Sequence, residues 1–462
     1  MKKPHSIPLY LALTLALAGC ATQGNIPTPT SEQALASAQI PKQWQTPSAP
    51  SGVNVNDSQK WWEAFNDSAL NQLVEQALAK NSNLSSAGYK LRQAQLSAGL
   101  TENQLFPSIS ANVGARSSRA LDGSSSSAQS YSTGVTIAYT IDLWGKLSKA
   151  NSIKQWEAQA TEQDLRNTEL SIEGAVVKQY WLLAYLNQQI ASGNKSIDYA
   201  QQSLDLMRVK YKAGAVSNIE VLSAERSLAS QESAQESLIQ QRAVARNAMA
   251  ILFDAPPSAH IANEPDALPT GAIASVAAGI PAEVLARRPD VRAAELRLRE
   301  GLGGVDVARA NFYPNFALTG TIGTGSTNLT QLLSDPVGTL ALNLALPFLN
   351  WNENQLNLKI SKVAYQQSII SYRQTLYGAL QEVDNSLSAA HQYAKQGDKQ
   401  TIVYRNAKET ERLYEIRYRA GGSSYKDWLD ASETRRQAEL SYLANRYNQL
   451  INQVDVRLAL GG

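Results

Sequence analysis

The chain has few of the residues that build disulfides, metal sites and catalytic centres. Its 462 residues include one Cys and three His, so no disulfide can form within the chain and no His/Cys cluster can hold a metal ion. It contains no glycine-rich phosphate loop and no Ser/His/Asp set. The 42 Lys and Arg nearly balance the 40 Asp and Glu, so the charge balance does not indicate a nucleic-acid-binding protein. Composition therefore favours a protein that is not an enzyme and holds neither cofactor nor metal.

The only cysteine, Cys20, ends a short apolar segment. Two lysines precede an apolar run over residues 7–18, which is too short to cross a bilayer as a permanent helix. The run ends in Leu17-Ala18-Gly19-Cys20, which resembles a bacterial lipoprotein signal. That resemblance implies removal of residues 1–19, with S-diacylglycerol and N-palmitoyl groups on Cys20. Ala21 stands where an inner-membrane retention signal has Asp, which favours the outer membrane; the alternative is an ordinary signal peptide with an incidental cysteine.

An N-terminal tether is followed by two copies of one sequence pattern. Residues 20–57 are rich in Pro, Ser, Thr and Gln, and we expect them to form an extended tether. Four landmarks then recur 207 positions apart: Leu91-Arg92 and Leu298-Arg299, Phe106-Pro107 and Tyr313-Pro314, Trp144 and Trp351, Tyr211 and Tyr418. The spacing predicts an internal duplication. Its copies are residues 58–253 and 280–462, joined by a connection over 254–279.

Each copy combines a helix, a strand hairpin and two long helices. The hairpins are predicted over 106–143 and 312–349, where apolar and small polar residues alternate with a period of two. The apolar face falls on odd positions in the first copy and on even positions in the second. Strands of 11 or more residues are long enough to cross a bilayer at a tilt.

The long helices are predicted over 146–252 and 350–460, each broken once by a glycine turn. A helix of some 60 residues reaches about 90 Å, which no ordinary globular domain needs. In the second copy a seven-residue seam recurs at Leu376, Leu380, Val383 and Leu387, and again at Leu440, Leu443, Tyr447, Leu450 and Val454. A coiled coil and a hairpin buried within one subunit both fit this seam.

Four strands cannot close a sheet in hydrocarbon, where open edges are not tolerated. The chain must therefore pool strands with copies of itself, eight in a dimer or twelve in a trimer. Eight strands fill their own interior with side chains. The small polar residues of the inner face suit a wet lumen, which favours a trimer, although the count alone leaves a dimer open.

Four stretches carry a resemblance to a known family: Tyr139–Lys146, Gly279–Glu295, Ala310–Pro314 and Tyr418–Ala431. With them the chain resembles the TolC-like outer-membrane efflux proteins, in the lipoprotein branch that serves resistance-nodulation-division pumps. The resemblance implies an α-dominated mixed fold. In it, a homotrimer forms a 12-stranded β-barrel in the outer membrane, with four strands per chain, continuous with a periplasmic α-helical barrel. It also implies a passive exit duct for drugs or other toxic small molecules, which an inner-membrane pump drives through a periplasmic adaptor.

The same resemblance implies a gate near the second glycine turn. The motif Tyr-x-x-Gly-x5-Asp-x-x-Asp-Ala matches Tyr418, Gly421, Asp427, Asp430 and Ala431. In a trimer the two aspartates would form two rings of three carboxylates, which favour cations. The alternative is that both are solvated acids in the first turn of a helix. The first copy carries Glu220 and Ser223 at the equivalent positions, and therefore lacks the acidic pair.

Other residues at the turns differ from the family pattern or have a second use. Glu433 stands where relatives of the lipoprotein branch carry Arg, which leaves Lys426 as a substitute partner in the gate. The resemblance places adaptor contacts at the two turns, around Lys212 and Gly214 and around Arg419 and Gly421. Glycine after the last helical residue also has a purely structural use, as a left-handed cap.

Two other functions compete with an efflux duct. One is a structural envelope lipoprotein built on a coiled coil. Such a scaffold has no need for two hairpins with a lipid-compatible face, so the strands argue against it. The other is an exit duct for type I protein secretion.

Overall fold

A computed structural model of the chain describes residues 29–30, 33, 39–46, 53–54, 60–119, 127–257, 259, 263–271 and 276–462. Cys20, the expected cleavage site and most of the expected tether lie outside the described residues. The described chain divides into two compact units, one containing residues 105–150 and 301–369 and the other residues 151–300 and 370–462. Each unit therefore draws on both copies of the repeat.

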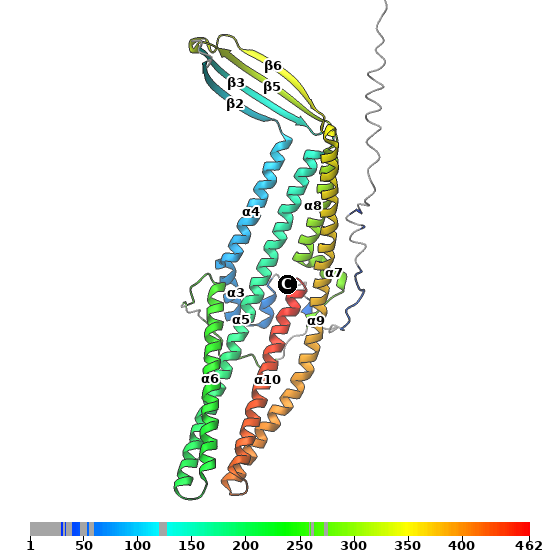
Figure 1. The fold of residues 1–462 in the computed structure, drawn as a ribbon. Coiled ribbons are helices and arrows are strands. Elements are labelled where there is room, and N and C mark those ends of the chain that lie inside the picture. The colour runs from blue at the N-terminus through cyan, green and yellow to red at the C-terminus, as the bar shows by residue number, and fades with distance from the viewer. Residues whose placement is uncertain are drawn as a thin grey trace, which may run out of the picture. The chain divides into compact units, whose positions relative to one another are not determined.

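The first unit holds a four-stranded antiparallel sheet (Figure 1). Its strands are β2 (Ser108–Arg119), β3 (Ser127–Ile141), β5 (Asn315–Ser326) and β6 (Val337–Ala345). The order β2-β3-β5-β6 joins the two hairpins through a pairing of β3 with β5. Within the described residues, β2 and β6 each have only one neighbouring strand, so the sheet of a single chain is open at both edges.

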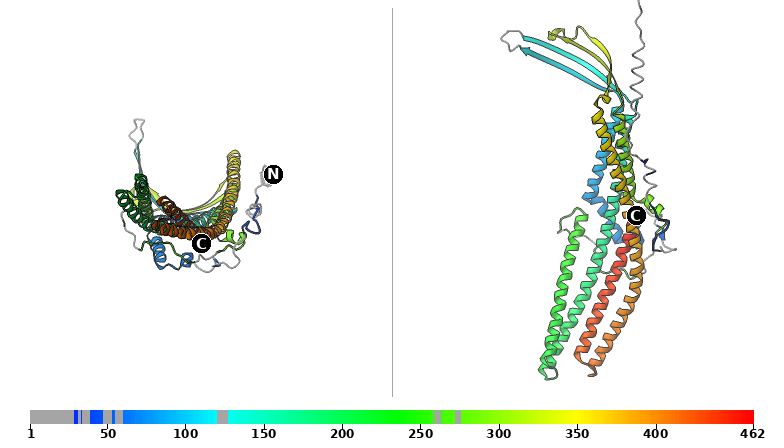
Figure 2. Two further views of the ribbon diagram at one scale, coloured as in Figure 1. Left: turned by 90° about the horizontal axis from the view of Figure 1, so that it is seen from below. Right: turned by 45° about the vertical axis from the view of Figure 1, so that its right-hand side comes forward.

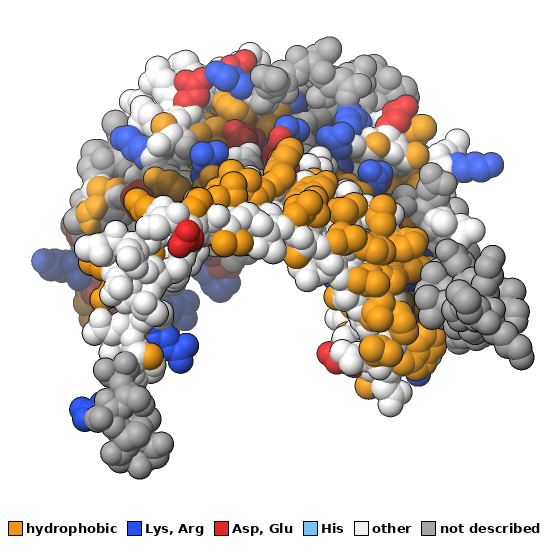
Figure 3. Space-filling view, turned by 90° about the horizontal axis from the view of Figure 1, so that it is seen from above, with side chains coloured by type: hydrophobic (Ala, Val, Ile, Leu, Met, Phe, Trp, Pro, Cys, Tyr) orange, Lys and Arg blue, Asp and Glu red, His pale blue; other side chains and the backbone are white. Residues whose placement is uncertain are grey.

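The cross-strand register gathers the apolar positions of all four strands on one face. Ile109 lies opposite Ile137, Val135 opposite Ile322, and Leu318 opposite Leu342. Large apolar side chains on this face are exposed, including Val113, Leu340 and Leu344. Hydrophobic side chains accordingly gather along part of the surface shown in Figure 3. The predicted alternation, odd in the first copy and even in the second, is confirmed.

Aromatic residues of the repeat hold the base of the sheet. Trp144 stacks on Tyr313 with ring centres 4.8 Å apart, and its indole nitrogen donates to the carbonyl oxygen of Pro314 at 2.8 Å. Trp351, the counterpart of Trp144, makes an edge contact with Phe312. The landmarks that recur along the sequence therefore also meet in space where strands give way to helices.

The second unit is helical. It contains α3 (Ser68–Lys80), α4 (Ser82–Glu102), α6 (Asn218–Leu252), α7 (Pro281–Arg287) and α10 (Tyr425–Ala459). It also contains most of α5 (Lys146–Lys212), the first part of α8 (Pro289–Ala310) and the later part of α9 (Trp351–Arg419). In this unit α5 lies beside α6, and α9 beside α10 (Figures 1 and 2).

The duplication is visible in the element bounds. The first and last residues of β5 each lie 207 positions after those of β2, and the same spacing separates α10 from α6. Helices α5 and α9 end at Lys212 and Arg419, which are again one repeat apart. Each copy is thus the same series of helix, hairpin and long helix pair.

The main core of the helical unit lies where α5, α6 and α10 meet the chain after the tether. Trp61 and Trp62, in the 3₁₀ helix Trp61–Phe65, pack with residues of α3 and α5. Asp67 caps α3, because its carboxylate accepts from the backbone N–H groups of Ala69 and Leu70. Leu450 and Val454 of α10 belong to the same cluster.

The heptad seam of the second copy is buried within the chain. Leu376, Val383 and Leu443 are each less than 5% exposed. The seam therefore holds the helix pair of a single chain together, so of the two arrangements that fit the sequence, the single-chain hairpin is present. In the part of the chain that the structure describes, no helix has an apolar stretch long enough to cross a membrane.

Candidate functional site

The two long helix pairs turn on the same glycine motif. After α5, the N–H of Gly214 donates to the carbonyl of Tyr211 and that of Ala215 to the carbonyl of Lys210. The N–H groups of Gly421 and Gly422 repeat both bonds after α9. The backbone φ angle is 71° at Gly214 and 78° at Gly421, a left-handed conformation that glycine adopts without strain. Both glycines are therefore helix caps of the Schellman type.

An aromatic cluster beside the second turn ties the two helix pairs together. Tyr418 at the end of α9 stacks on Trp428 of α10, with ring centres 5.2 Å apart. Buried side chains of the first pair pack against these rings, namely Leu204, Met207, Val221 and Ala224. The hydroxyl groups of Tyr425 and Ser203 lie 2.6 Å apart and add a polar link from α10 to α5.

Lys210 makes the one charged contact that the described residues show between α5 and this aromatic cluster. Its ammonium group donates to the hydroxyl of Tyr418 at 2.7 Å and lies 4.3 Å from the centre of the same ring. Tyr418 is 8% exposed, so the contact is largely shielded from water. The resemblance named Tyr418 as a gate residue but did not point to Lys210, because no local pattern pairs residues so far apart along the chain.

Asp427 caps the helix on which it stands. Its carboxylate accepts from the backbone N–H of Ser424 at 3.0 Å and from the Ser424 hydroxyl at 2.7 Å. In return, the Ser424 hydroxyl accepts from the backbone N–H of Asp427, which completes a capping box. The bond from the Ser424 side chain lowers the pKa of Asp427 below its ordinary value. Asp427 is therefore a negative charge at neutral pH with a structural use of its own.

The first copy has a related cap, although its serine hydroxyl accepts from the N–H of Ile219 and forms no capping box. The hydroxyl of Ser217, the N-cap of α6, bonds to the carboxylate of Glu220 and lowers its pKa. An acid at this position is thus common to both helix pairs. The asymmetry between the copies lies at Asp430, where the first copy has Ser223.

Asp430 lies one turn further along α10 and is exposed to solvent. Its side chain pairs with Lys426 at 2.6 Å, four residues earlier on the same helix. The two side chains are 63% and 81% exposed. A pair this exposed does not hold the turn together, and it leaves the carboxylate accessible to a solute.

The hydrogen bonds that Glu433 makes among the described residues lie within its own helix. Its carboxylate bonds to both the ε and η nitrogens of Arg436 on its own helix, which lowers the pKa of Glu433. The neighbouring Arg435 instead bridges the helices, bonding to Glu411 of α9 and to Glu439 of α10. The sequence interpretation missed this bridge, since Arg435 is one of several charged residues of α10 with no distinguishing pattern.

The turn residues proposed as adaptor contacts are accessible. Lys212 is exposed, and Arg419 pairs with Glu415 on its own helix through a side chain that is 72% exposed. Across the described ranges, no three His, Cys, Asp or Glu side chains come close enough to hold a metal ion.

A sequence model described as "Outer membrane efflux protein" matches residues 73–252 and 280–462, which is most of the chain. The chain belongs to this family. The matched ranges follow the two copies of the repeat, and the resemblance that the motifs carried is confirmed.

Two curated relatives and one solved structure show how much of the chain is shared. Toxin and drug export protein A of Aggregatibacter actinomycetemcomitans is 27% identical over 99% of this chain and 97% of its own length. Cation efflux system protein CusC of Escherichia coli is 27% identical, with 98% of each chain covered. The outer-membrane channel OprN superposes with a TM-score of 0.84, at 23% identity, covering 96% of this chain and 99% of that one.

These findings establish the setting of the molecule. The chain is an outer-membrane efflux protein, the outer-membrane duct of a tripartite efflux system, and it extends into the periplasm. The predicted fold class is confirmed, since each chain contributes a four-stranded sheet and two long helix pairs.

Proposed function

We propose that three copies of the chain form a passive, gated exit duct that performs no catalysis. The observation that carries this proposal is the sheet with two open edges, at β2 and at β6. An apolar, exposed face and unpaired strand edges are compatible with hydrocarbon only when copies close a barrel. Twelve strands from three chains enclose a water-filled lumen, whereas eight from two chains do not.

A second surface supports association through the helices. Five exposed apolar residues of α9 follow steps of 4, 3, 7 and 7: Leu356, Ile360, Val363, Ile370 and Tyr377. This spacing is a coiled-coil seam that is distinct from the seam buried inside the chain. We assign it to a second copy, because the same copies that close the sheet bring their long helices together.

We place the gate at the second turn, in the acids Asp427 and Asp430. In a trimer they contribute six carboxylates near the threefold axis, which attract cations and repel anions. The Lys210–Tyr418 contact and the aromatic cluster hold the second helix pair against the first. Opening the duct requires the second pair to move away from the first, so this contact favours the closed state.

The remaining partners follow from the same proposal. Cys20 carries S-diacylglycerol and N-palmitoyl groups that anchor the mature N-terminus in outer-membrane lipid. A periplasmic adaptor contacts the turns around Lys212, Gly214, Arg419 and Gly421, and a resistance-nodulation-division pump in the inner membrane supplies the driving force. The cargo consists of drugs or other toxic small molecules.

One relative favours a second candidate function. Toxin and drug export protein A is named for the export of a toxin as well as drugs, so an exit duct for type I protein secretion remains a competing proposal. Deleting the gene tests both. Loss of resistance to several drugs, dyes or bile salts, restored by the cloned gene, supports efflux of small molecules. Unchanged resistance with loss of a secreted protein supports secretion.

The stoichiometry has its own test. Mass measurement of the purified, acylated protein in detergent by light scattering should give three chains per particle. A mass of two chains or one would contradict the trimer.

A further inference from the structure

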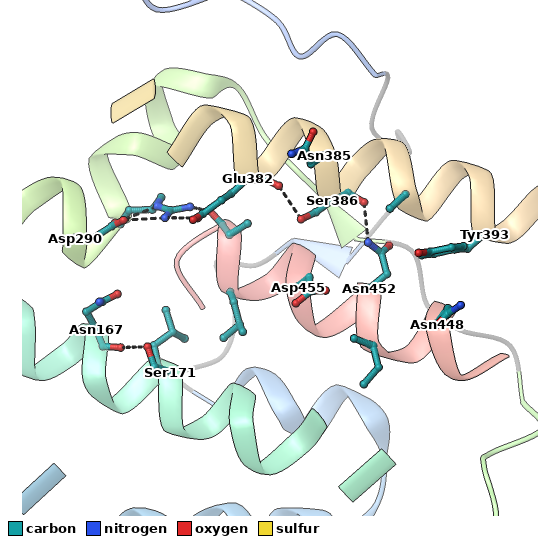
Figure 4. Close-up of a pocket in the computed structure, with 16 residues that line it drawn as sticks. Asn167, Ser171, Asp290, Glu382, Asn385, Ser386, Tyr393, Asn448, Asn452 and Asp455 are labelled. Carbon is teal, nitrogen blue, oxygen red and sulfur yellow. Dashed lines mark hydrogen bonds and ion pairs between the residues drawn. The ribbon is translucent and has the colours of Figure 1, made fainter. Parts of the chain in front are cut away.

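A cavity of about 660 Å³ lies in the helical unit, between α5, α9, α10 and the start of α8 (Figure 4). Its volume is in the range of pockets that hold a drug-sized molecule. Polar groups and aliphatic side chains line it together, with Leu170, Ile451 and Leu458 among the latter. No residue of the turns or of the aromatic cluster takes part.

One wall of the cavity borders the main core, because its leucine and isoleucine side chains also pack against that core. The other wall lies on the opposite side of α10. Leu450 and Val454 pack in that core with Trp61, whereas Asn452 and Asp455 line the cavity. Asn452 follows Leu450 by two residues, which is about 200° around a helix. In the trimeric duct proposed above, the core side is covered by the chain's own 3₁₀ helix and α3, so we assign the cavity side to the lumen.

The cavity carries more negative than positive charge. Arg288, which is 7% exposed, bonds through its guanidinium to both Asp290 and Glu382 and to the carbonyl of Ala459. Two carboxylates thus face one cation. The third carboxylate, Asp455, is paired with Lys178 from outside the lining. Glu382 is 62% exposed, and one of its oxygens faces solvent without a donor among the described residues.

The cavity also offers hydrogen-bond acceptors. Asn452 is only 5% exposed, and its amide nitrogen donates to the carbonyl of Ser386 at 3.0 Å. Within the described chain, no donor reaches its amide oxygen. Asn385 on α9 and Asn448 on α10 also line the cavity, and neither side-chain amide has a hydrogen-bond partner among the described residues. Asn452 is the buried member of this set, and its amide oxygen can accept a hydrogen bond from a ligand in the cavity.

We propose that this cavity is a transit site in the duct wall for amphiphilic organic cations, meaning an ammonium or guanidinium group on an apolar body. The cation's N–H groups donate to Glu382 and to the amide oxygen of Asn452, and the apolar body lies against Leu170, Ile451 and Leu458. The inference rests on the proposed duct, since only there does the cavity face the passing cargo. A metal ion is a poor fit, because Arg288 already occupies the carboxylates of Asp290 and Glu382.

A matched pair of probes tests the charge requirement. Dansylcadaverine carries a primary ammonium on a fluorescent apolar group, and its N-acetyl derivative is the same dye without the charge. We expect the full-length protein in lipid nanodiscs to bind dansylcadaverine at least ten times more tightly than the acetylated dye, by fluorescence anisotropy. Equal affinity for the two dyes, or no saturable binding of either, would overturn the proposal.

Three variants locate the site. Glu382→Gln should weaken dansylcadaverine binding about fivefold or more. Asn452→Ala should weaken it while leaving the Arg288 contacts intact. Asp398→Asn is the matched control, an exposed carboxylate on the same helix outside the cavity, and should bind as the unmodified protein does. If Asp398→Asn weakens binding as much as Glu382→Gln, the effect is a general one of charge and the site is disproved.

Drug resistance separates this proposal from the duct itself. A strain that relies on the Glu382→Gln variant should keep its resistance to neutral drugs and lose part of its resistance to cationic ones. Intact resistance to both classes of drug, together with unaltered dye binding, would disprove the transit site without contradicting the proposed duct. Failure of the unmodified gene to restore any resistance would instead disprove the proposed duct.

Discussion

The ammonium group of Lys210 lies 2.7 Å from the hydroxyl of Tyr418, so the last turn of α5 is bound to the last turn of α9. The two residues belong to different copies of the repeat. The contact therefore joins the first helix pair to the second within one chain. It lies beside the acids that we assign to the gate, where it can oppose their movement.

Removing this contact should open the duct. A hydrogen bond to a charged group contributes about 1.5 kcal/mol, so Tyr418→Phe should raise the open probability about tenfold per subunit. The ring and its stacking on Trp428 are retained in this variant. Lys210→Met should have a similar effect, while Lys212→Met, an exposed lysine two residues further on, serves as the control. Single-channel recordings measure the result, and an open probability that does not change would exclude Lys210 and Tyr418 from the gate.

The buried carboxyl of Glu173 should make stability depend on pH. Glu173 is 6% exposed and accepts from the indole nitrogen of Trp61 at 2.6 Å. Burial raises its pKa to about 7, although the bond from Trp61 opposes the shift. Because the folded pKa lies above the ordinary value of 4.5, Glu173 costs no stability below about pH 4.5. The cost grows as pH rises from about 4.5 to about 7, and it is complete above the folded pKa.

Thermal unfolding across this range measures the effect. The shift corresponds to about 3 kcal/mol lost per chain by about pH 8. Glu173→Gln should remove that part of the loss in melting temperature between about pH 4 and pH 8. Glu169→Gln, an exposed carboxylate one turn earlier on α5, should reduce the loss only slightly, because the charge of Glu169 is the smallest of the influences on the pKa of Glu173. An identical pH dependence in Glu173→Gln and the unmodified protein would show that Glu173 is not the group responsible.

Cys20 should be the site of acylation. Cys20→Ala should abolish incorporation of radiolabelled palmitate, and the protein should still reach the outer membrane, because the strands provide their own anchoring. Since the chain has one cysteine, no other thiol can substitute. Palmitate that still entered the variant would contradict the lipid assignment.

The sequence predicted regular elements well because each has a local period. The constant spacing between the two copies located the second turn from the first, and alternation gave the apolar strand face. Contacts between distant segments had no such signal. The pairing of β3 with β5 and the Lys210–Tyr418 contact depend on how the two copies come together, which no local pattern encodes.

The candidate site was predicted only in part. Asp427 was recognised, yet its bond to Ser424 shows that it caps a helix whether or not it gates a pore. The exposed seam from Leu356 to Tyr377 was missed, because the stronger seam at Leu376–Leu387 dominates the same helix. The Arg435 bridge and the cavity around Asn452 are formed by residues of separate helices, so no sequence motif predicts them.

Ion selectivity in planar bilayers gives the sharpest test of the acidic gate. The unmodified protein should give small, mostly closed, cation-preferring currents. Replacing Asp427 and Asp430 by Asn removes both charges but keeps oxygen acceptors for the cap at Ser424, and Glu220→Gln provides the same change at the first turn as a control. We predict a higher conductance and a weakened cation preference in the double variant alone. A cation preference that persists unchanged in that variant would contradict the account.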